Sequence, residues 1–338
     1  MQHVVIAIVA GLLLLAIAGC NELPTAPADA TGMAVRGVTL ADWTATGYAS
    51  ASAATAIDDI ARLGANRLVI VVTAYQERTS DSAVRVDPRK TPVASAVRQA
   101  ASAAAAAGME VAIKLHVDLD DGEWRGNIRP ADVNAWFDSY GSWVRGWADE
   151  ASAMGAVQLV AGTELAGTIE HGDRWRDVIA SVRTRFGGEV VYAASWDEAW
   201  MVPFWDAVDR VGVDFYAPVS GRAQAGRVEI LAGWQPWIER LNRLRGQTDK
   251  SILLTEIGYR SVDGAGMRPW DFTGDAGYDG GEQADLYWAA LEAVAGKDWI
   301  EGVYWWNWLV RGEGGPLDTD YTPRGKPAAG ELEGAWNG

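Results

Sequence analysis

VQLVAGTEL, residues 157–165, and SILLTEIGY, residues 251–259, are two short stretches that share one pattern. In each, a run of apolar, β-prone residues leads into a glutamate, Glu164 in the first and Glu256 in the second. Such runs favour buried strands. A carboxylate at the end of a buried strand is held by the sheet and points into the space beyond the strand ends. Two glutamates from distant parts of the chain can therefore meet at one ligand.

Further β-prone runs alternate with longer segments of helical period, which is typical of repeated β/α units around a parallel sheet. Eight strands are predicted, at 34–40, 67–73, 110–116, 157–162, 190–196, 211–216, 251–256 and 302–308. Helices are predicted at 53–63, 93–107, 131–154, 174–186, 227–244 and 282–295, and the connection after the fifth strand is short and rich in tryptophan.

The number of these units favours an α/β fold of the (β/α)8 TIM-barrel type, with a single catalytic domain at residues 33–310. A closed barrel of this kind usually needs roughly 250 residues. An open, doubly wound sheet is the alternative. Residues 311–338 are rich in glycine and proline at their start, and we expect them to form a C-terminal surface segment.

The composition restricts the class of ligand. The 338 residues are 49% hydrophobic and carry a net charge of −16, which disfavours nucleic acid and anionic membrane surfaces because both require cationic contacts. Tryptophan outnumbers phenylalanine by 18 to 5, and its ring offers a flat apolar face with a polar edge. Sugar rings suit such faces, so a neutral oligo- or polysaccharide is the expected partner.

Metal and cofactor sites are not expected. The chain has three histidines and a single cysteine, Cys20, and no spacing offers three His or Cys ligands to one metal. Neither a phosphate-binding glycine loop followed by Lys-Ser/Thr nor a dinucleotide fingerprint is found.

The N-terminus predicts export. Residues 4–18 are continuously apolar, shorter than the roughly 20 residues of a membrane-spanning helix, and Ile17-Ala18-Gly19-Cys20 follows the pattern of a bacterial lipoprotein signal. We therefore expect a signal peptide at 1–20, lipidation of Cys20 and a tether at 21–32, giving an envelope protein that contacts a membrane only through its lipid anchor. The alternative is an exported protein with an incidental cysteine, and the leading Met1-Gln2-His3 lacks the usual Lys or Arg.

In a β/α barrel the active site lies at the C-terminal ends of the strands. The residues that the sequence places there include two glutamates, together with aromatic and hydrogen-bonding groups: Trp43, His116, Asp118, Glu164, Trp196, Asp197, Asp214, Tyr216, Glu256, Trp305, Trp306 and Asn307. Cleavage of a glycosidic bond with retention needs one carboxyl group that donates a proton and another that stays ionised, about 5–5.5 Å apart. The fourth and seventh strands, across the barrel mouth from one another, can supply that pair.

The neighbours suggest finer roles. Tyr216 ends the strand next to Glu256 and is placed to donate a hydrogen bond to it, and Trp305 or Trp306 can form an apolar floor beneath the sugar. Each residue also has a structural interpretation: a lone strand-end glutamate is more often a surface or capping residue, His116 can be a satisfied strand-end histidine and Asp118 a loop cap. No catalytic role is predicted for Asp214.

The ordered set of motifs resembles glycoside hydrolase family 113, whose known members are endo-β-1,4-mannanases, within the clan of eightfold barrels with catalytic glutamates on strands four and seven. The motifs are IKLHVD (113–118), GTEL (162–165), VYAASW (191–196), VDFYAP (213–218), TEIGY (255–259) and YWWN (304–307). The resemblance spans roughly residues 33–310.

This resemblance implies that Glu164 is the general acid/base and Glu256 the nucleophile of a retaining β-mannanase. Thr163 departs from much of the clan, in which asparagine precedes the acid/base and binds the sugar 2-hydroxyl. The residues expected to contact substrate are Trp43, His116, Asp118, Thr163, Trp196, Tyr216, Trp305 and Trp306. The alternatives are a glycan-binding surface lipoprotein without activity and a hydrolase of another β-glycan or envelope sugar.

Overall fold

The computed structural model describes residues 26–311 and 314–338. Its strands are parallel and close into a barrel in sequence order, β1 to β8. They are β1 (Val35–Ala41), β2 (Arg67–Gln76), β3 (Glu110–Leu119), β4 (Gln158–Thr163), β5 (Glu189–Ser195), β6 (Arg210–Asp214), β7 (Ile252–Ile257) and β8 (Ile300–Leu309). All eight predicted strands are confirmed, and the open-sheet alternative is wrong because β1 pairs with β8.

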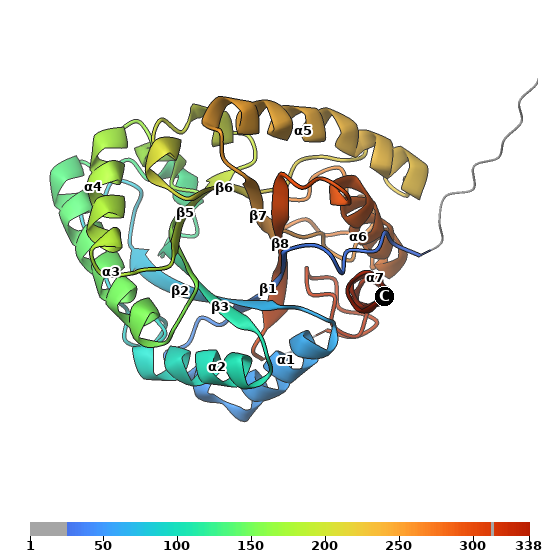
Figure 1. The fold of residues 1–338 in the computed structure, drawn as a ribbon, viewed down its shortest axis with the longest axis horizontal. Helices are drawn as coiled ribbons and strands as arrows, with labels where there is room; N and C mark the ends of the chain where they lie inside the picture. The colour runs from blue at the N-terminus through green and yellow to red at the C-terminus, as the bar shows by residue number, and fades with distance from the viewer. Residues whose placement is uncertain (1–25, 312–313) are drawn as a thin grey trace, which may run out of the picture.

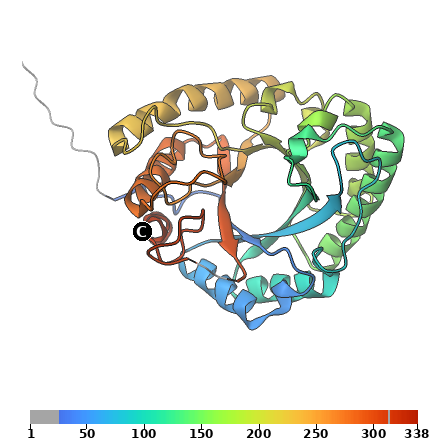
Figure 2. The ribbon, with the colours of Figure 1, turned by 180° about the vertical axis from the view of Figure 1, so that it is seen from behind.

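The helices form a ring around the barrel (Figures 1 and 2). They are α1 (Ala51–Arg62), α2 (Ala94–Ala106), α3 (Val133–Ala153), α4 (Gly172–Arg183), α5 (Arg227–Thr248), α6 (Gly280–Val294) and α7 (Pro327–Asn337). The six predicted helices are all present. After β5, two short 3₁₀ turns, Ala199–Met201 and Trp205–Ala207, take the place of a helix.

The C-terminal segment contains α7, which the sequence analysis did not predict. This helix lies beside α6, at the side of the barrel where β8 meets β1 (Figure 1). Leu332 and Trp336 on α7 are buried, and Asn337 Nδ2 donates to the carbonyl of Arg62 at the end of α1. Residues 327–337 therefore form an amphipathic helix of the outer shell, which has both buried and exposed residues.

The barrel is filled at its N-terminal end by side chains that meet across its axis. Tyr304 is fully buried between Val35, Val69, Ala112 and Leu253, and its hydroxyl donates to Gln158 Oε1 at 2.6 Å. Gly37 leaves the room for this ring, because a Cβ there would lie 2.2 Å from Tyr304 Cδ1. The interior is thus a packed core at this end, as in other barrels of this type.

Ion pairs between strands surround this core. Arg67, which begins β2, pairs with Glu110 of β3 at 2.5 Å, and Arg210, which begins β6, pairs with Glu189 of β5 at 2.6 Å and with Glu301 of β8. These charges lie at the strand starts, the end of a β/α barrel that serves stability, which leaves the other end for ligand chemistry.

The predicted signal peptide and Cys20 lie outside the described residues. Of the predicted tether, the described part packs against the domain: the carbonyl of Ala26 accepts from Trp288 Nε1 at 3.1 Å, and the Ala30 N–H donates to the carbonyl of Ala335. In the described ranges, no helix has the length and apolar character needed to cross a bilayer.

Candidate active site

A β-bulge in β7 sets the direction of Glu256. The register between β6 and β7 runs from Val213 opposite Leu254 to Asp214 opposite Glu256, so Thr255 is the extra residue. In a regular strand, consecutive side chains point to opposite faces. At this bulge both Thr255 and Glu256 point into the barrel, since the Thr255 hydroxyl donates to Asp214 and Glu256 accepts from Lys114.

Both carboxylate oxygens of Glu256 are held by residues from other parts of the barrel, on β3 and just after β6. Oε1 accepts from Lys114 Nζ of β3 at 2.6 Å and lies 3.5 Å from His116 Nε2, while Oε2 accepts from the Tyr216 hydroxyl at 2.7 Å. Burial and the charge of Glu256 raise the pKa of Tyr216, so its phenol keeps the proton it donates. The predicted bond between Tyr216 and Glu256 is confirmed.

Glu164 directly follows β4 in an unusual backbone conformation. Its φ is 51°, in the left-handed region that residues other than glycine rarely adopt, and its N–H donates to the carbonyl of Ala193 on β5 at 2.8 Å. The carboxylate then lies near the loop that follows β3: Oε2 is 3.4 Å from both Trp124 Nε1 and Arg125 Nη1. Arg125 also binds Asp118 Oδ1 at 2.6 Å.

The surroundings of the two glutamates shift their pKa values in opposite directions. Burial raises the pKa of Glu164, and repulsion from Glu256 adds to this, while Arg125 opposes it only in part. Burial would likewise raise the pKa of Glu256, but Lys114 and His116 outweigh it and lower the pKa overall. At neutral pH, one carboxyl can therefore hold a proton while the other stays ionised.

The aromatic residues of β8 face opposite sides of the strand. Trp306 is half-buried and stacks on His116, with ring centroids 5.8 Å apart and planes 13° apart. Trp305 is 1% exposed and stacks on Tyr287 of α6 at 4.0 Å, outside the barrel. The expectation that Trp305 contacts substrate is therefore wrong, because strand alternation turns it into the outer core.

The remaining predicted contacts differ in accessibility. Trp43, after β1, is 38% exposed, whereas Trp196, after β5, is half-buried and stacks on Trp270 with centroids 5.6 Å apart. Thr163 is fully buried, and its hydroxyl has no hydrogen-bond partner among the described residues. The residue has no exposed surface in this conformation, and its expected contact with the sugar stays a prediction.

Three groups that contact the glutamates were not among the predicted site residues: Lys114, Trp124 and Arg125. Lys114 had a signal, since it is a charge within the apolar run VAIKLHV and lies two residues before His116, on the same strand face. Trp124 and Arg125 lie in the loop after β3, whose path the sequence pattern does not predict. These contacts depend on the folded loop.

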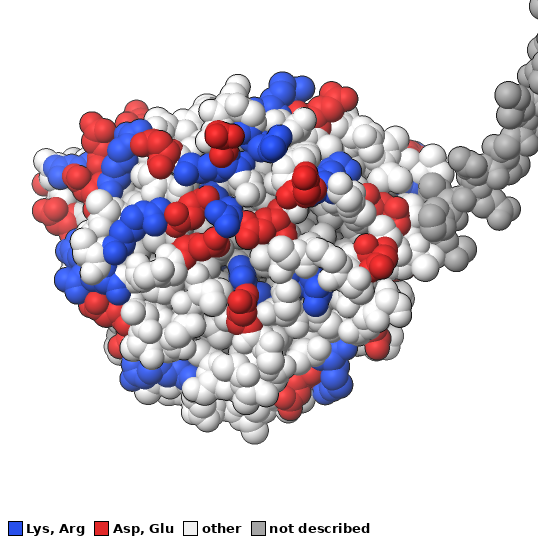
Figure 3. Space-filling view, in the orientation of Figure 1, with Lys and Arg blue, Asp and Glu red and all other residues white. Residues whose placement is uncertain are grey.

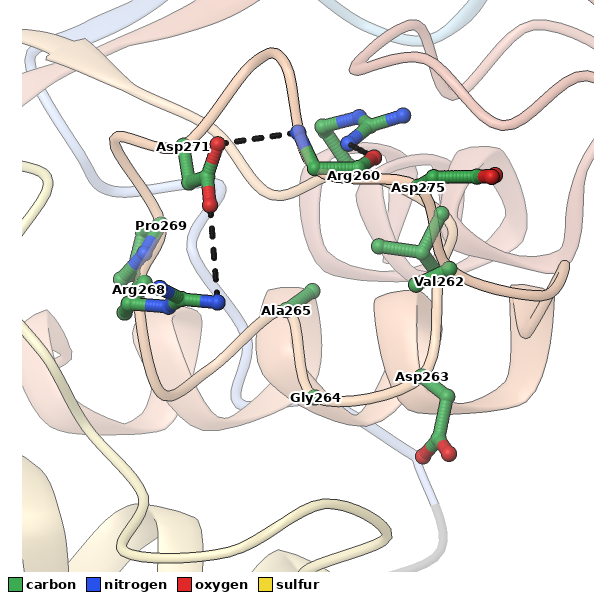
Figure 4. A pocket seen from close by; sticks show the side chains of 11 residues that line it. Arg260, Val262, Asp263, Gly264, Ala265, Arg268, Pro269, Asp271 and Asp275 are labelled. Atoms are coloured by element: carbon green, nitrogen blue, oxygen red, sulfur yellow. Dashed lines mark hydrogen bonds and ion pairs between the residues drawn. The ribbon is translucent and has the colours of Figure 1, made fainter.

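The loop between β7 and α6 encloses a separate cavity of about 140 Å³ (Figure 4). Part of its charged lining is already used inside the loop: Arg260 Nη1 donates to the carbonyl of Gly274 at 2.6 Å, and Arg268 lies 3.6 Å from Asp271. Neither Glu164 nor Glu256 lines this cavity.

Three acids near the same loop, Asp263, Asp279 and Glu282, bring carboxylate oxygens within 4.8 Å of one another. Two of these carboxylates have structural partners. Asp279 caps α6 by accepting from the Glu282 N–H, and Glu282 accepts backbone N–H groups of Gln224 and Gly264 at 3.0 Å. We therefore explain this cluster by loop and helix-end stabilisation.

Acidic and basic side chains are interspersed on the face shown in Figure 3. Acidic and basic side chains alternate in a band across this face, beside a broad uncharged area. Interspersed charges of both signs produce no strong single-sign field there.

We predict that His116 stays neutral well below the usual histidine range. Burial, followed by the charge of Arg125, lowers the pKa of His116 to about 4, although Glu256 opposes the shift. A proton NMR titration of the imidazole signals, with His116 assigned by its loss in His116→Gln, should show no charging of this ring above about pH 5. A His116 midpoint near 6.5 would contradict the described packing.

Comparison with known proteins assigns the chain to a family. The model of Glycoside Hydrolase Family 113 matches residues 38–326. A search of curated protein sequences finds no match. Among solved structures, the family 113 β-mannanase of Alicyclobacillus acidocaldarius, in complex with ManMIm, is 26% identical with a TM-score of 0.83, over 90% of this chain and 97% of that chain.

A second structure, of a family 113 β-1,4-mannanase, is 23% identical with a TM-score of 0.84, over 90% of this chain and 99% of its own. A complex structure of a family 113 β-1,4-mannanase is 22% identical with a TM-score of 0.83, over 90% and 98%. These two likenesses support the barrel fold, and the family match covers nearly all of the barrel. The chain therefore belongs to glycoside hydrolase family 113 and is a glycoside hydrolase.

Proposed function

We propose that the protein is a retaining β-mannanase in which Glu164 is the acid/base and Glu256 the nucleophile. The observation that carries the proposal is the contrast between the two carboxyl environments. Burial and Glu256 raise the pKa of Glu164, whereas Lys114 and His116 overcome burial and lower the pKa of Glu256. A retaining glycosidase requires such a pair, one proton donor and one ionised nucleophile.

In the first step, the Glu256 carboxylate attacks the anomeric carbon and the glycosidic C–O bond breaks. Glu164 gives its proton to the departing oxygen, so no alkoxide has to leave. In the second step, the Glu164 carboxylate takes a proton from water, whose oxygen attacks the same carbon. The ester bond that the first step formed between the anomeric carbon and Glu256 then breaks. Glu256 is returned as a carboxylate, and the configuration at the anomeric carbon is retained.

The surrounding residues support both steps. Glu164 has a side chain 13% exposed, against 5% for Glu256, so water can reach the residue that must exchange protons. Arg125 lies close enough to stabilise Glu164 when it becomes a carboxylate between the steps. Trp306, stacked on His116, offers a flat surface for the sugar ring.

The choice of β-1,4-mannan rests on relatives. The family 113 structures named above are described as β-mannanases, and one was solved with ManMIm. A β-1,4-linked mannan is therefore the first substrate to test. The sequence left open a hydrolase of another β-glycan or envelope sugar. Hydrolysis rates on a panel that also contains other β-glycans and envelope sugars distinguish this alternative from a β-mannanase.

We predict that Glu164→Gln and Glu256→Gln each reduce kcat on β-1,4-mannooligosaccharides by about 10³-fold or more, because each removes a group that forms or breaks a bond. The melting temperature should change little, since Asp214 can ionise and pair with Lys114 when Glu256 is neutral. Glu170→Gln is a matched control, because the Glu170 side chain is 75% exposed.

The leaving group distinguishes the two roles. On an aryl β-mannoside whose phenol leaves without protonation, Glu164→Gln should still form the glycosyl-enzyme, whereas Glu256→Gln should not. Near-normal turnover of oligosaccharide by either variant would overturn the assignment. Binding of mannooligosaccharides to the unmodified protein with no product from any substrate would instead favour a glycan-binding protein.

We also propose that the protein is exported and anchored in a bacterial envelope membrane through Cys20. This proposal rests on the N-terminal sequence alone. It predicts that the unmodified protein incorporates labelled fatty acid and sediments with membranes, while Cys20→Ser does neither, because the lipid has lost its attachment point. Unchanged labelling and sedimentation of Cys20→Ser would rule out this anchor.

A further inference from the structure

Lys114 lies inside the barrel with no exposed surface. An ammonium group has three N–H donors, and three acceptors surround this one: Asp214 Oδ1 at 2.8 Å, the carbonyl of Thr255 at 2.9 Å and Glu256 Oε1 at 2.6 Å. All three donors are therefore in use. The ammonium cannot turn toward another acceptor without losing one of these bonds, so its direction toward Glu256 is fixed.

Asp214 is the group that holds Lys114 from the far side. Its Oδ1 accepts from Lys114 and also from the Thr255 hydroxyl at 2.7 Å. Its Oδ2 has no partner, and within the described residues no hydrogen bond joins Asp214 to Glu256. Asp214 therefore contacts Lys114 and the bulge residue Thr255 but not Glu256 itself.

One ammonium cannot neutralise two buried carboxylates. Burial and repulsion by Glu256 raise the pKa of Asp214 to about 8, although Lys114 opposes the shift. The Lys114 charge therefore serves Glu256 at neutral pH, and Asp214 contributes an oxygen acceptor while it holds a proton.

Other groups also act on the Glu256 carboxylate. The titratable and charged side chains around it come from β3, from β6, from the segments that follow β3, β4 and β6, and from the C-terminal segment: Lys114, His116, Glu164, Asp214, Tyr216, Arg125 and Tyr321. His116 and Tyr216 are neutral near pH 6, because burial lowers the pKa of the first and raises that of the second. Lys114 is the cation in direct contact with Glu256.

We propose that Lys114 and Asp214 are a pair of positioning residues, in which Lys114 fixes the charge and direction of the nucleophile Glu256 and Asp214 acts only by holding Lys114. This inference rests on the proposed function, because it assigns the pair to the nucleophile of that reaction. The Lys114 ammonium makes three bonds to β6 and β7, and these bonds direct its buried charge at one oxygen of Glu256. An ion pair that served packing alone would not need all three donors to be fixed.

The test uses four variants of the full-length protein. Lys114→Met removes the charge and keeps the length of the side chain. Asp214→Asn keeps an acceptor oxygen, and Asp214→Ala removes it. The double variant Lys114→Met/Asp214→Ala shows whether the effect of Asp214 on activity depends on Lys114. Lys326→Met is the matched control, since Lys326 is also a buried lysine, bound to Ser261 and Asp318 in the C-terminal segment.

On β-1,4-mannooligosaccharides, Lys114→Met should lower kcat by about 100-fold with little change in KM and move the acidic limb of the kcat/KM profile upward by about one pH unit or more. Asp214→Asn should stay within about threefold of the unmodified protein at pH 6, whereas Asp214→Ala should lose about tenfold. The double variant should lose no more kcat than Lys114→Met does. Lys326→Met should keep the kcat/KM profile of the unmodified protein.

An acidic limb that does not move in Lys114→Met would overturn the pairing, as would losses of kcat from Lys114→Met and Asp214→Ala that multiply in the double variant. A second readout does not depend on activity. With ¹³C-labelled glutamate and Glu256 assigned through Glu256→Gln, NMR should show the pKa of the Glu256 carboxyl rising in Lys114→Met. If the unmodified protein cleaved no substrate, the proposed function would fail, while an unchanged Glu256 pKa would overturn the pairing itself.

Discussion

The buried ammonium of Lys114 is the contact on which the arrangement of the active site depends. A charge in a barrel interior loses its hydration, and that cost is offset only when all its donors are paired. Here the partners come from β6 and β7, and the bulge at Thr255 brings a carbonyl and a carboxylate of β7 to the same cation. These contacts lower the pKa of Glu256, although burial alone would raise it.

The opposite half of the site follows from a different constraint. Glu164 leaves β4 in a left-handed conformation and meets the loop after β3, where Arg125 is bound by Asp118. The contact between Arg125 and Glu164 is longer, at 3.4 Å, than the bond between Lys114 and Glu256, at 2.6 Å. A weaker cation contact beside a more exposed carboxyl suits a group that must gain and lose a proton during each cycle.

The parts of this site that sequence could predict are those governed by strand pattern. Short β-prone runs, separated by segments of helical period, indicated all eight strands, and glutamates at the ends of two such runs indicated Glu164 and Glu256. The bond from Tyr216 to Glu256 followed from the adjacency of β6 and β7. These features depend on local pattern and on the parallel order of the strands, so they do not require knowledge of the loops.

The parts that were missed depend on faces and on chain paths. Trp305 and Trp306 are adjacent in sequence and chemically identical, and only the orientation of β8 decides that Trp306 lies by His116 and Trp305 by α6. The place of Arg125 depends on the folded loop after β3. Helix α7 has a short amphipathic stretch rich in alanine and glycine, a weak signal, and its burial comes from packing against α6.

The central claim is a double displacement at Glu256 assisted by Glu164, and the stereochemistry of the product tests it most directly. Proton NMR of β-1,4-mannooligosaccharide hydrolysis by the unmodified protein, recorded in the first minutes, reports the anomer that leaves the enzyme before mutarotation. The account predicts that the β-anomer appears first and the α-anomer grows in later. Initial release of the α-anomer would contradict it, because a single displacement by water would then have occurred.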